Sequence, residues 1–338
     1  MSRLWVALAI VAQLLVLVWM AGEREWILRT GRVVYLRTAP IDPRDLFRGD
    51  FVRLHYEINS VRTDAVEPVA PAAAGERRRH ETVYTRLRPA GEGLHEAAGT
   101  SATRPADGLF LRGRTEDAWR MGRRGTGHFL VKYGIEQLFV EQGSGLAIEK
   151  RRGARDALQV PMEVEVAVAP SGTAVIRGYR WSRLGMKLEV LRRPAPRNRN
   201  VAGPEGPLSP KLRVTLTNVS EVPLSVADAG EHCAFHLVPV EWATHYAPAS
   251  QACVGAPPAA QAITLARGET YSAELDLSAP RWHMLADGKP VEIGALPGFA
   301  QFRIEYRAPD LAPSAAGEAS LWRGRMASQA FNASGVID

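Results

Sequence analysis

The sequence predicts a mostly β protein that an N-terminal transmembrane helix anchors to a membrane. Residues 4–22 are apolar except for Gln13. In the rest of the chain, Pro and Gly are frequent and Val, Ile and Thr recur in alternation with polar residues, which favours strands over helices. The 338 residues, less the anchor, suffice for two domains of ordinary size.

The first predicted element is the apolar segment LWVALAIVAQLLVLVWMAG, residues 4–22. As a helix it extends roughly 28 Å, close to the hydrocarbon thickness of a bilayer. A cleaved signal peptide is the alternative, but the apolar run is longer than a signal core, and bulky Trp19 stands where cleavage needs a small residue. Trp5, Trp19 and Trp26 also lie near the two ends, where indole rings favour the headgroup region. We expect a retained anchor, residues 1–23, that contacts the lipid bilayer through residues 4–22.

The charges beside the anchor and the two cysteines give opposite indications about orientation. Only Arg3 precedes the anchor, whereas Arg24, Arg29, Arg32 and Arg37 follow it, which by the positive-inside rule holds the body in the cytoplasm. Large domains nevertheless cross membranes largely regardless of charge, and two cysteines that can pair suit an oxidising compartment. We expect a single-pass protein of the cytoplasmic membrane with a periplasmic body.

The net charge of +6 does not indicate a nucleic-acid partner. Arginine supplies most of the positive charge, and the arginines are spread along the chain among Glu and Asp residues. A nucleic-acid footprint would gather them on one stripe or patch. The sequence therefore excludes nucleic-acid binding, and it identifies no small-molecule ligand or cofactor.

The clearest break in the chain is RRPAPRNRNVAGPEGPLSP, residues 192–210, which lacks any apolar periodicity. Its Pro, Gly and Asn residues are typical of an exposed linker. The sequence thus predicts a first β domain over residues 24–191 and a second over residues 211–338.

The first domain is expected to open with a strand at residues 32–37, followed by a strand at residues 48–58. In the second of these, Val52, Leu54, Tyr56 and Ile58 alternate with Arg53, His55 and Glu57. That alternation is typical of a half-buried strand whose polar face meets solvent. Further strands are expected at residues 82–88, 108–112, 129–140, 161–168 and 175–181, with 129–140 and 161–168 forming a hairpin-like pair.

The motif strand resembles a known family. Its sequence Gly49-Asp50-Phe51-Val52-Arg53-Leu54-His55-Tyr56 is similar to the signature of the GDYXXLXY protein family, with Phe51 in place of the named Tyr. The flanking residues 42–48 and 133–145 are similar too, so the resemblance covers about residues 30–180. It implies a membrane-anchored bacterial domain without an assigned activity, often found beside a polytopic membrane protein.

The resemblance supplies no catalytic residue, so we interpret the motif as structural. Gly49 permits a tight turn into the strand and Asp50 caps that turn. Phe51, Leu54 and Tyr56 are the ring and apolar positions of the motif, and Leu54 and Tyr56 are expected to bury one face of the strand.

A catalytic alternative comes from a second resemblance. The order of anchor, Thr38-Ala39-Pro40, Arg48-Gly49-Asp50 and Val131-Lys132-Tyr133 is similar to the order of motifs in type I signal peptidases. In that hypothesis Thr38 is the nucleophile and Lys132 the general base. The chain lacks their Ser-Met-Pro, Gly-Asp-Asn and Ser-Asp-Ser elements, so the resemblance favours a barrel-like domain without the activity. We therefore expect a non-enzymatic binding or accessory protein.

Clustered carboxylates allow two further chemical hypotheses. Asp42, Asp45 and Asp50 could bind Ca²⁺, but their spacing fits no EF-hand and Asp is common in turns. Glu136, Glu141 and Glu149 could form an acid/base pair. In alternating strands, however, such residues more often face solvent.

The second domain alternates cleanly at Leu212, Val214 and Leu216, and again at Phe302, Ile304 and Tyr306. Short strands with regular turns predict an antiparallel β-sandwich, similar in layout to immunoglobulin-like modules. Such a layout does not fix a function.

Two cysteines and nearby histidines permit either a disulfide or a zinc site in the second domain. The candidates are His232, Cys233, His236, His245 and Cys253. Zinc ligands are usually paired at both ends of a site, and the downstream end offers only Cys253. A disulfide between Cys233 and Cys253 would close a loop of about twenty residues and stabilise it by roughly 3 kcal/mol. The sequence thus predicts the disulfide and no metal.

Overall fold

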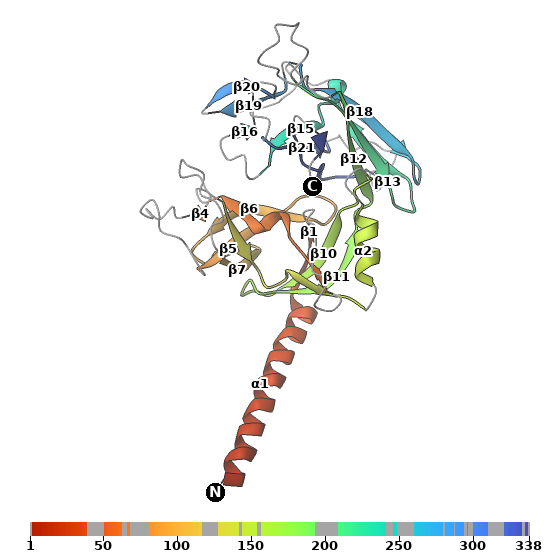
Figure 1. Ribbon diagram of the computed structural model, residues 1–338. Coiled ribbons are helices and arrows are strands. Elements are labelled where there is room, and N and C mark those ends of the chain that lie inside the picture. The colour runs from red at the N-terminus through yellow and green to blue at the C-terminus, as the bar shows by residue number, and fades with distance from the viewer. Residues whose placement is uncertain are drawn as a thin grey trace.

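The computed structural model places two β regions on a long N-terminal helix (Figure 1). It describes residues 2–38, 51–62, 66–67, 81–116, 128–141, 144–153, 157–192, 209–240, 246–248, 260–279, 281–286, 288–293, 296, 300–309, 321–332 and 335–336. Gly49, Asp50, His245 and Cys253 lie outside these residues, as does nearly all of the predicted linker. So do Asp42 and Asp45.

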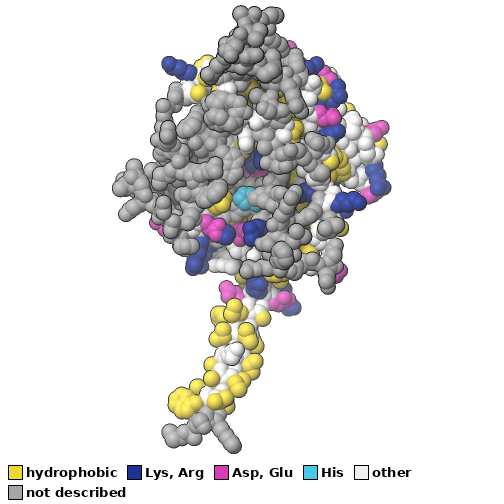
Figure 2. Space-filling view, in the orientation of Figure 1, with side chains coloured by type: hydrophobic (Ala, Val, Ile, Leu, Met, Phe, Trp, Pro, Cys, Tyr) yellow, Lys and Arg dark blue, Asp and Glu magenta, His cyan; other side chains and the backbone are white. Residues whose placement is uncertain are grey.

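Helix α1 (Ser2–Thr30) is long and apolar enough to cross a membrane, and its apolar part is not buried by the rest of the chain. Figure 2 shows apolar side chains along the visible face of the helix and charged ones where it meets the body. The helix continues past the predicted end of the anchor at residue 23, and in this part Arg29 pairs with Glu25 one turn earlier at 2.7 Å. The Thr30 hydroxyl donates to the Trp26 carbonyl oxygen at 2.8 Å in the last turn.

The helix leads directly into the first β region. Strands β1 (Arg32–Arg37), β10 (Met162–Val168) and β11 (Ala174–Trp181) lie in segments that were predicted to be strands, and they form an antiparallel sheet. Leu36 on β1 and Val164 and Val166 on β10 face inward and are fully buried. This sheet is therefore one wall of the first core.

A larger sheet forms the opposite wall. Its order is β3-β8-β7-β5-β6-β4, and the short pair β2-β9 lies beside it. Bridges join Tyr35 to Leu94 and Thr38 to Tyr56, so the sheets curve into a nearly closed barrel-like wall. The strands are β2 (Phe51–Arg53), β3 (Ser60–Arg62), β4 (Val66–Glu67), β5 (Thr82–Pro89), β6 (His95–Ser101), β7 (Phe110–Thr115), β8 (His128–Lys132) and β9 (Gln137–Phe139).

The prediction of a single strand at residues 129–140 is wrong in one respect. A turn at Gly134, whose φ is +82°, divides it into β8 and β9. Glu136 stabilises that turn by accepting hydrogen bonds from the Tyr133 and Gly134 amides at 2.7 and 3.0 Å. The expected pairing with residues 161–168 is also wrong, because β8 pairs with β3 and β7. Helix α2 (Ser144–Arg152) follows and was not predicted.

The second region consists of several antiparallel sheets around one core, in agreement with the predicted β architecture. The sheets are β12-β13-β18, β14-β17, β16-β19-β20 and a sheet centred on β15-β21. The strands are β12 (Leu184–Arg192), β13 (Lys211–Asn218), β14 (Leu224–Asp228), β15 (Phe235–Pro239), β16 (Tyr246–Pro248), β17 (Gln261–Leu265), β18 (Thr270–Asp276), β19 (His283–Ala286), β20 (Lys289–Glu292), β21 (Phe302–Arg307), β22 (Arg325–Ala327), β23 (Phe331–Asn332) and β24 (Gly335–Val336). The immunoglobulin-like layout stays a prediction.

Strand β12 belongs to the second region although it precedes the predicted linker. It pairs with β13 along its length, and Leu184, Met186 and Leu188 join the second core. The first core ends with β11, which contributes Trp181. The chain thus passes from one core to the other near Ser182, and no extended linker separates the two regions at that point.

Candidate functional site

Of the strand predicted at residues 48–58, the described residues form only β2 (Phe51–Arg53), and a short 3-10 helix at Glu57–Asn59 ends the motif segment. Its apolar side chains are nevertheless buried as the alternation predicts. Leu54 and Tyr56 are 3% and 0% exposed, and both belong to the first core. The Leu54 amide donates to the Glu136 carbonyl oxygen at 2.8 Å, and the Tyr56 hydroxyl donates to the Ile135 carbonyl oxygen at 2.7 Å. The Leu54 backbone and the Tyr56 side chain therefore fix the motif segment to the turn between β8 and β9.

Two polar residues that the sequence analysis did not single out complete this arrangement. Asn59 is 2% exposed and donates through Nδ2 to the Val131 carbonyl oxygen at 2.6 Å. The Tyr133 hydroxyl donates to the Ile58 carbonyl oxygen at 3.0 Å. Burial raises the pKa of both Tyr56 and Tyr133, so the two phenols stay protonated and act as structural hydrogen-bond donors. Asn59 follows the predicted strand at residues 48–58, so no pattern in the sequence identifies its burial.

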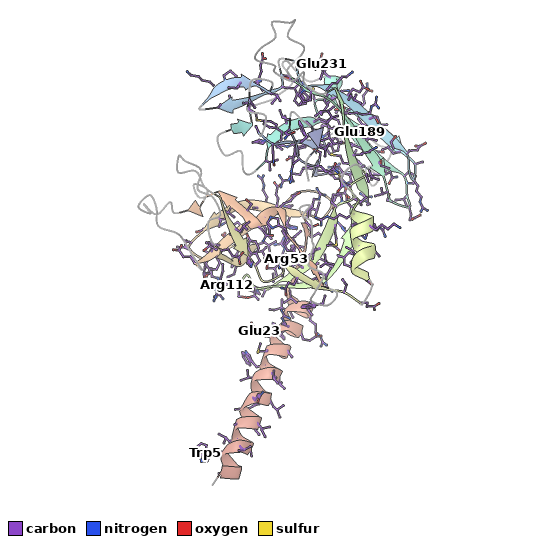
Figure 3. All side chains as sticks on the ribbon, viewed as in Figure 1. Trp5, Glu23, Arg53, Arg112, Glu189 and Glu231 are labelled. Atoms are coloured by element: carbon purple, nitrogen blue, oxygen red, sulfur yellow. The ribbon has the colours of Figure 1, made fainter. Side chains whose placement is uncertain are left out.

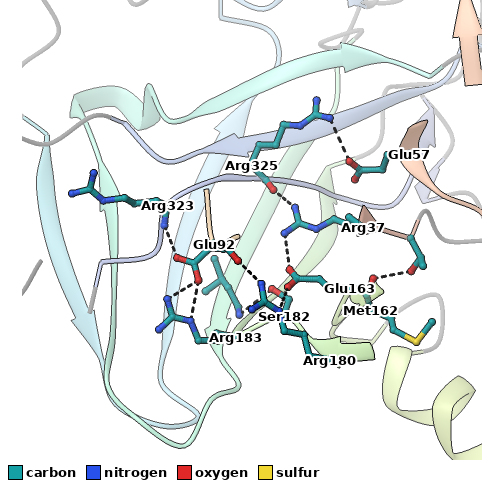
Figure 4. A network of polar contacts seen from close by, with 12 residues as sticks. Arg37, Glu57, Glu92, Met162, Glu163, Arg180, Ser182, Arg183, Arg323 and Arg325 are labelled. Atoms are coloured by element: carbon teal, nitrogen blue, oxygen red, sulfur yellow. Dashed lines mark hydrogen bonds and ion pairs between the residues drawn. The ribbon is translucent and has the colours of Figure 1, made fainter. Parts of the chain in front are cut away.

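The outer face of the motif segment differs from the expectation of a solvated face. Arg53 is exposed, but His55 is partly buried, and burial together with the positive charge of Arg303 lowers its pKa. Glu57 pairs with Arg325 Nη2 at 3.4 Å (Figure 4). Arg303 and Arg325 belong to the second region, which therefore covers this face.

A buried group of charges continues the contact between the two regions. Arg37, at the end of β1, is 6% exposed and pairs with Glu163 at 3.0 Å, while Arg180 approaches the other oxygen of Glu163 at 2.8 Å. Arg37 also donates to the backbone carbonyl oxygen of Arg325 (Figure 4). A guanidinium held by the first region thus binds the backbone of the second.

Glu92 forms a second connection from the turn before β6. Its carboxylate accepts both Nε and Nη2 of Arg183, at 3.0 and 2.6 Å, and its other oxygen accepts the Arg323 amide at 3.1 Å. Arg180 donates to the Glu92 carbonyl oxygen. The backbone at Glu92 is left-handed, with φ +53°, a conformation that costs energy in a non-glycine residue and is kept because these bonds require it.

These contacts border a cleft of about 370 Å³ between the two regions. Its lining includes Glu96, Arg307, Arg323 and Arg325. Glu96 pairs with Arg325 at 2.7 Å, and Arg307 donates to Glu305 at 2.5 Å, so carboxylates already neutralise two of the guanidinium groups. The arrangement can hold the two regions in one orientation. The described residues that line the cleft include no Ser, Thr, Cys, His or Lys.

The structure does not bring the two residues of the peptidase hypothesis together. The Thr38 hydroxyl is buried and donates to the Met162 carbonyl oxygen at 3.0 Å. Lys132 is exposed on β8 and forms an ion pair with Glu116. Thr38 borders a cavity of about 10 Å³, which is room for one water molecule and not for a peptide. Neither residue has the partner that a Thr-Lys mechanism needs.

A polar turn in the second region organises the predicted cysteine site. Asp228 accepts hydrogen bonds from the Tyr271 hydroxyl at 2.6 Å and from His232 Nδ1 at 2.9 Å. Burial raises the pKa of Asp228, but the bonds from His232 and Tyr271 outweigh it, and the net pKa is lowered. Glu231 and His232 both have left-handed φ, 54° and 60°, immediately before Cys233. Figure 3 shows Glu231 at the end of the molecule remote from α1.

The turn bears on the choice between zinc and a disulfide. His232 is bound to a carboxylate, and the described residues contain no group of three or more side chains suited to a metal ion. His236 lies on β15, where burial and the charge of Arg307 lower its pKa. Cys253 and His245 lie outside the described residues, so the disulfide stays a prediction.

Comparison with known proteins agrees with the resemblance carried by the motif strand. The family model described as GDYXXLXY protein matches residues 13–178, a range that includes the second half of α1 and nearly all of the first β region. No curated protein and no solved structure matches the chain. Over residues 13–178 the chain therefore belongs to the GDYXXLXY protein family.

Proposed function

We propose that the protein is a single-pass component of the cell envelope whose extracytoplasmic body binds a polytopic membrane protein and catalyses no reaction. The observation that carries this proposal is helix α1, whose apolar residues stay exposed along the whole segment suited to a bilayer. Exposed apolar surface on this scale is stable only when lipid or another protein covers it.

The way in which α1 joins the body supports a partner at the membrane. Ile27, near the end of the helix, is 3% exposed, and the Gly31 amide donates to its carbonyl oxygen at 2.8 Å. A Cβ atom at Gly31 would come within 2.5 Å of that same oxygen, so glycine is required there. Because β1 starts at the next residue, the body is held close to the end of the helix and within reach of other membrane proteins.

Binding in place of catalysis is supported by the partners of the charged side chains. Glu57, Glu92, Glu96 and Glu163 all pair with arginines at the junction of the two regions. Carboxylates with such partners stabilise an interface and are poorly placed to transfer protons. Lys132 is exposed and pairs with Glu116.

Extraction and topology reporters test the anchor and its orientation. We expect the full-length chain to remain in the membrane pellet after an alkaline carbonate wash and to dissolve only in detergent. A reporter that is active only outside the cytoplasm, fused after Asp338, should be active. Fluorescence from a cytoplasm-only reporter at the same position would place the body in the cytoplasm and contradict the proposed orientation.

Cross-linking in intact cells tests the partner. The full-length chain should cross-link to one integral membrane protein in a fixed ratio, and an unrelated single-pass protein with the same tag should not. Peptide hydrolysis by the purified full-length chain, abolished by Lys132→Ala, would instead establish the peptidase alternative.

A further inference from the structure

We propose that two copies of this chain pair within the membrane through the face of α1 that is centred on Gln13. The inference rests on the proposed function, because it requires α1 to span a bilayer. The proposed partner is a second copy of the same chain, and Gln13, the polar residue within the apolar segment, would form hydrogen bonds to it.

Gln13 lies at the centre of the apolar segment, nine residues after Leu4 and nine before Gly22. Its side chain carries two N–H donors and one carbonyl acceptor, and the hydrocarbon core of a bilayer has no water to bind them. Gln13 is exposed, and no side chain in the described part of the chain binds its amide. A carboxamide in that position is satisfied only by a partner that is itself in the membrane.

The chemistry of the amide favours a second copy. A carboxamide is complementary to itself, since the partial negative charge of its oxygen matches the partial positive charge of its N–H groups. A two-fold axis beside Gln13 lets each side chain donate to the other at the same time, which is the symmetry of most homodimers. The span contains no charged residue between Leu4 and Gly22, so it has no need of an oppositely charged partner.

The residues around Gln13 form a contiguous seam. Val6, Gln13 and Met20 are spaced by seven residues, and Ala9 and Val16 lie between them at the positions that complete a heptad pattern. Such a pattern places the five side chains on one helix face, and a polar residue at one heptad position fixes the register of the pair. Ala9 is small and lies one turn before Gln13, where it permits the close approach that an interhelical hydrogen bond needs.

Energy transfer between fluorescent labels on full-length chains in lipid vesicles measures the pairing. Gln13→Leu should weaken association roughly three- to thirtyfold, and Gln13→Asn should retain most of it. Ala9→Ile should weaken association by crowding the seam. The matched control is Ala7→Ile, which makes the same change on the opposite side of the helix and should leave association unchanged.

Several outcomes would overturn the inference. One is a full-length chain that is monomeric at every protein-to-lipid ratio, and another is a Gln13→Leu variant that pairs as well as the wild type. If Gln13→Leu keeps the wild-type energy transfer but no longer associates with a different membrane protein, then Gln13 binds that other protein. A chain released by carbonate would refute the proposed function as well, whereas a chain retained in the membrane as a monomer refutes only the pairing.

Discussion

Successive side chains of the motif segment point to two opposite faces, and the sequence predicts the surroundings of only one of these faces. Leu54 is buried because a strand with period two carries every second side chain into the core. His55 and Glu57 have the sequence pattern of a solvated face, yet residues of β21 and β22 cover them. No local pattern identifies a cover that comes from such a distant part of the chain.

Truncation of Leu54 should therefore have a much larger effect than truncation of Arg53. Leu54→Ala leaves a cavity in the first core and should lower the free energy of unfolding by about 2–5 kcal/mol. Arg53→Ala, on the exposed neighbour, should change it by no more than about 0.5 kcal/mol. Denaturant unfolding of the detergent-solubilised chain measures both. Equal losses would contradict the assignment of the two faces.

His55 should make the stability of the protein depend on pH. Burial and Arg303 lower its pKa below the ordinary 6.5, so the folded state favours the neutral ring. Its contribution is complete above pH 6.5 and declines as the pH falls from 6.5 towards the folded pKa, because the unfolded chain takes up the proton first. His55→Gln should reduce the loss of melting temperature between pH 7.5 and about pH 5.

His95 and His236 have lowered pKa values too, so the informative quantity is the difference between variant and wild type. An unchanged slope would show that His55 is solvated.

At the scale of elements, β1 has two tasks, because it lines the first core and ends at the junction with the second region. Val34 and Leu36 are buried in that core, and Arg37 reaches Glu163 and the Arg325 carbonyl oxygen. The apolar residues could be assigned from their alternation. The role of Arg37 could not, because a terminal arginine on a strand is usually exposed.

Removal of Arg37 should be costly because it leaves Glu163 buried. Arg37→Met should lower the free energy of unfolding by about 3 kcal/mol, since a buried carboxylate loses one of its two cations. Arg180 is 40% exposed, so Arg180→Met should have a smaller effect. Urea titrations of both variants compare them. A larger loss in Arg180→Met would mean that Arg180 is the principal partner of Glu163.

The turn before Cys233 should be closed by a disulfide. Mass spectrometry of peptides from the non-reduced, membrane-extracted chain should recover Cys233 linked to Cys253, and reduction should separate them. The left-handed residues Glu231 and His232 orient the backbone immediately before Cys233, and Asp228 holds this turn in place. Two cysteines that are both alkylated without reduction would exclude the bond.

At the scale of the whole molecule, the sequence predicts the apolar helix and most of the strands, but not which core strand β12 joins. Length and apolar composition suffice for the anchor, and alternation suffices for most strands. Strand β12 was assigned to the first region because the Pro-rich segment follows it, whereas its pairing with β13 joins it to the second. The junction was not predicted either, because it is assembled from charged residues that are far apart in the sequence.

Glu92 should couple the unfolding of the two regions. Glu92→Ala removes the acceptor of Arg183 and of the Arg323 amide, so calorimetry should show two transitions or a broader one where the wild type shows one. Arg112→Ala, on the exposed surface of β7, is the matched control and should keep the wild-type profile. A single sharp transition in Glu92→Ala would show that the remaining contacts suffice.

The direct passage from α1 through Gly31 to β1 limits how the body can search for a partner. If α1 spans a bilayer as proposed, the close contacts at Gly31 hold the body at one height above the membrane, whereas a protein on a flexible tether sweeps a hemisphere. Encounters are then confined to diffusion in two dimensions, which raises the effective concentration of any surface that stands at the matching height. Rotation or tilt of a membrane-spanning α1 would likewise change the orientation of the body, so the helix would transmit its own movement to the body as well as anchor it.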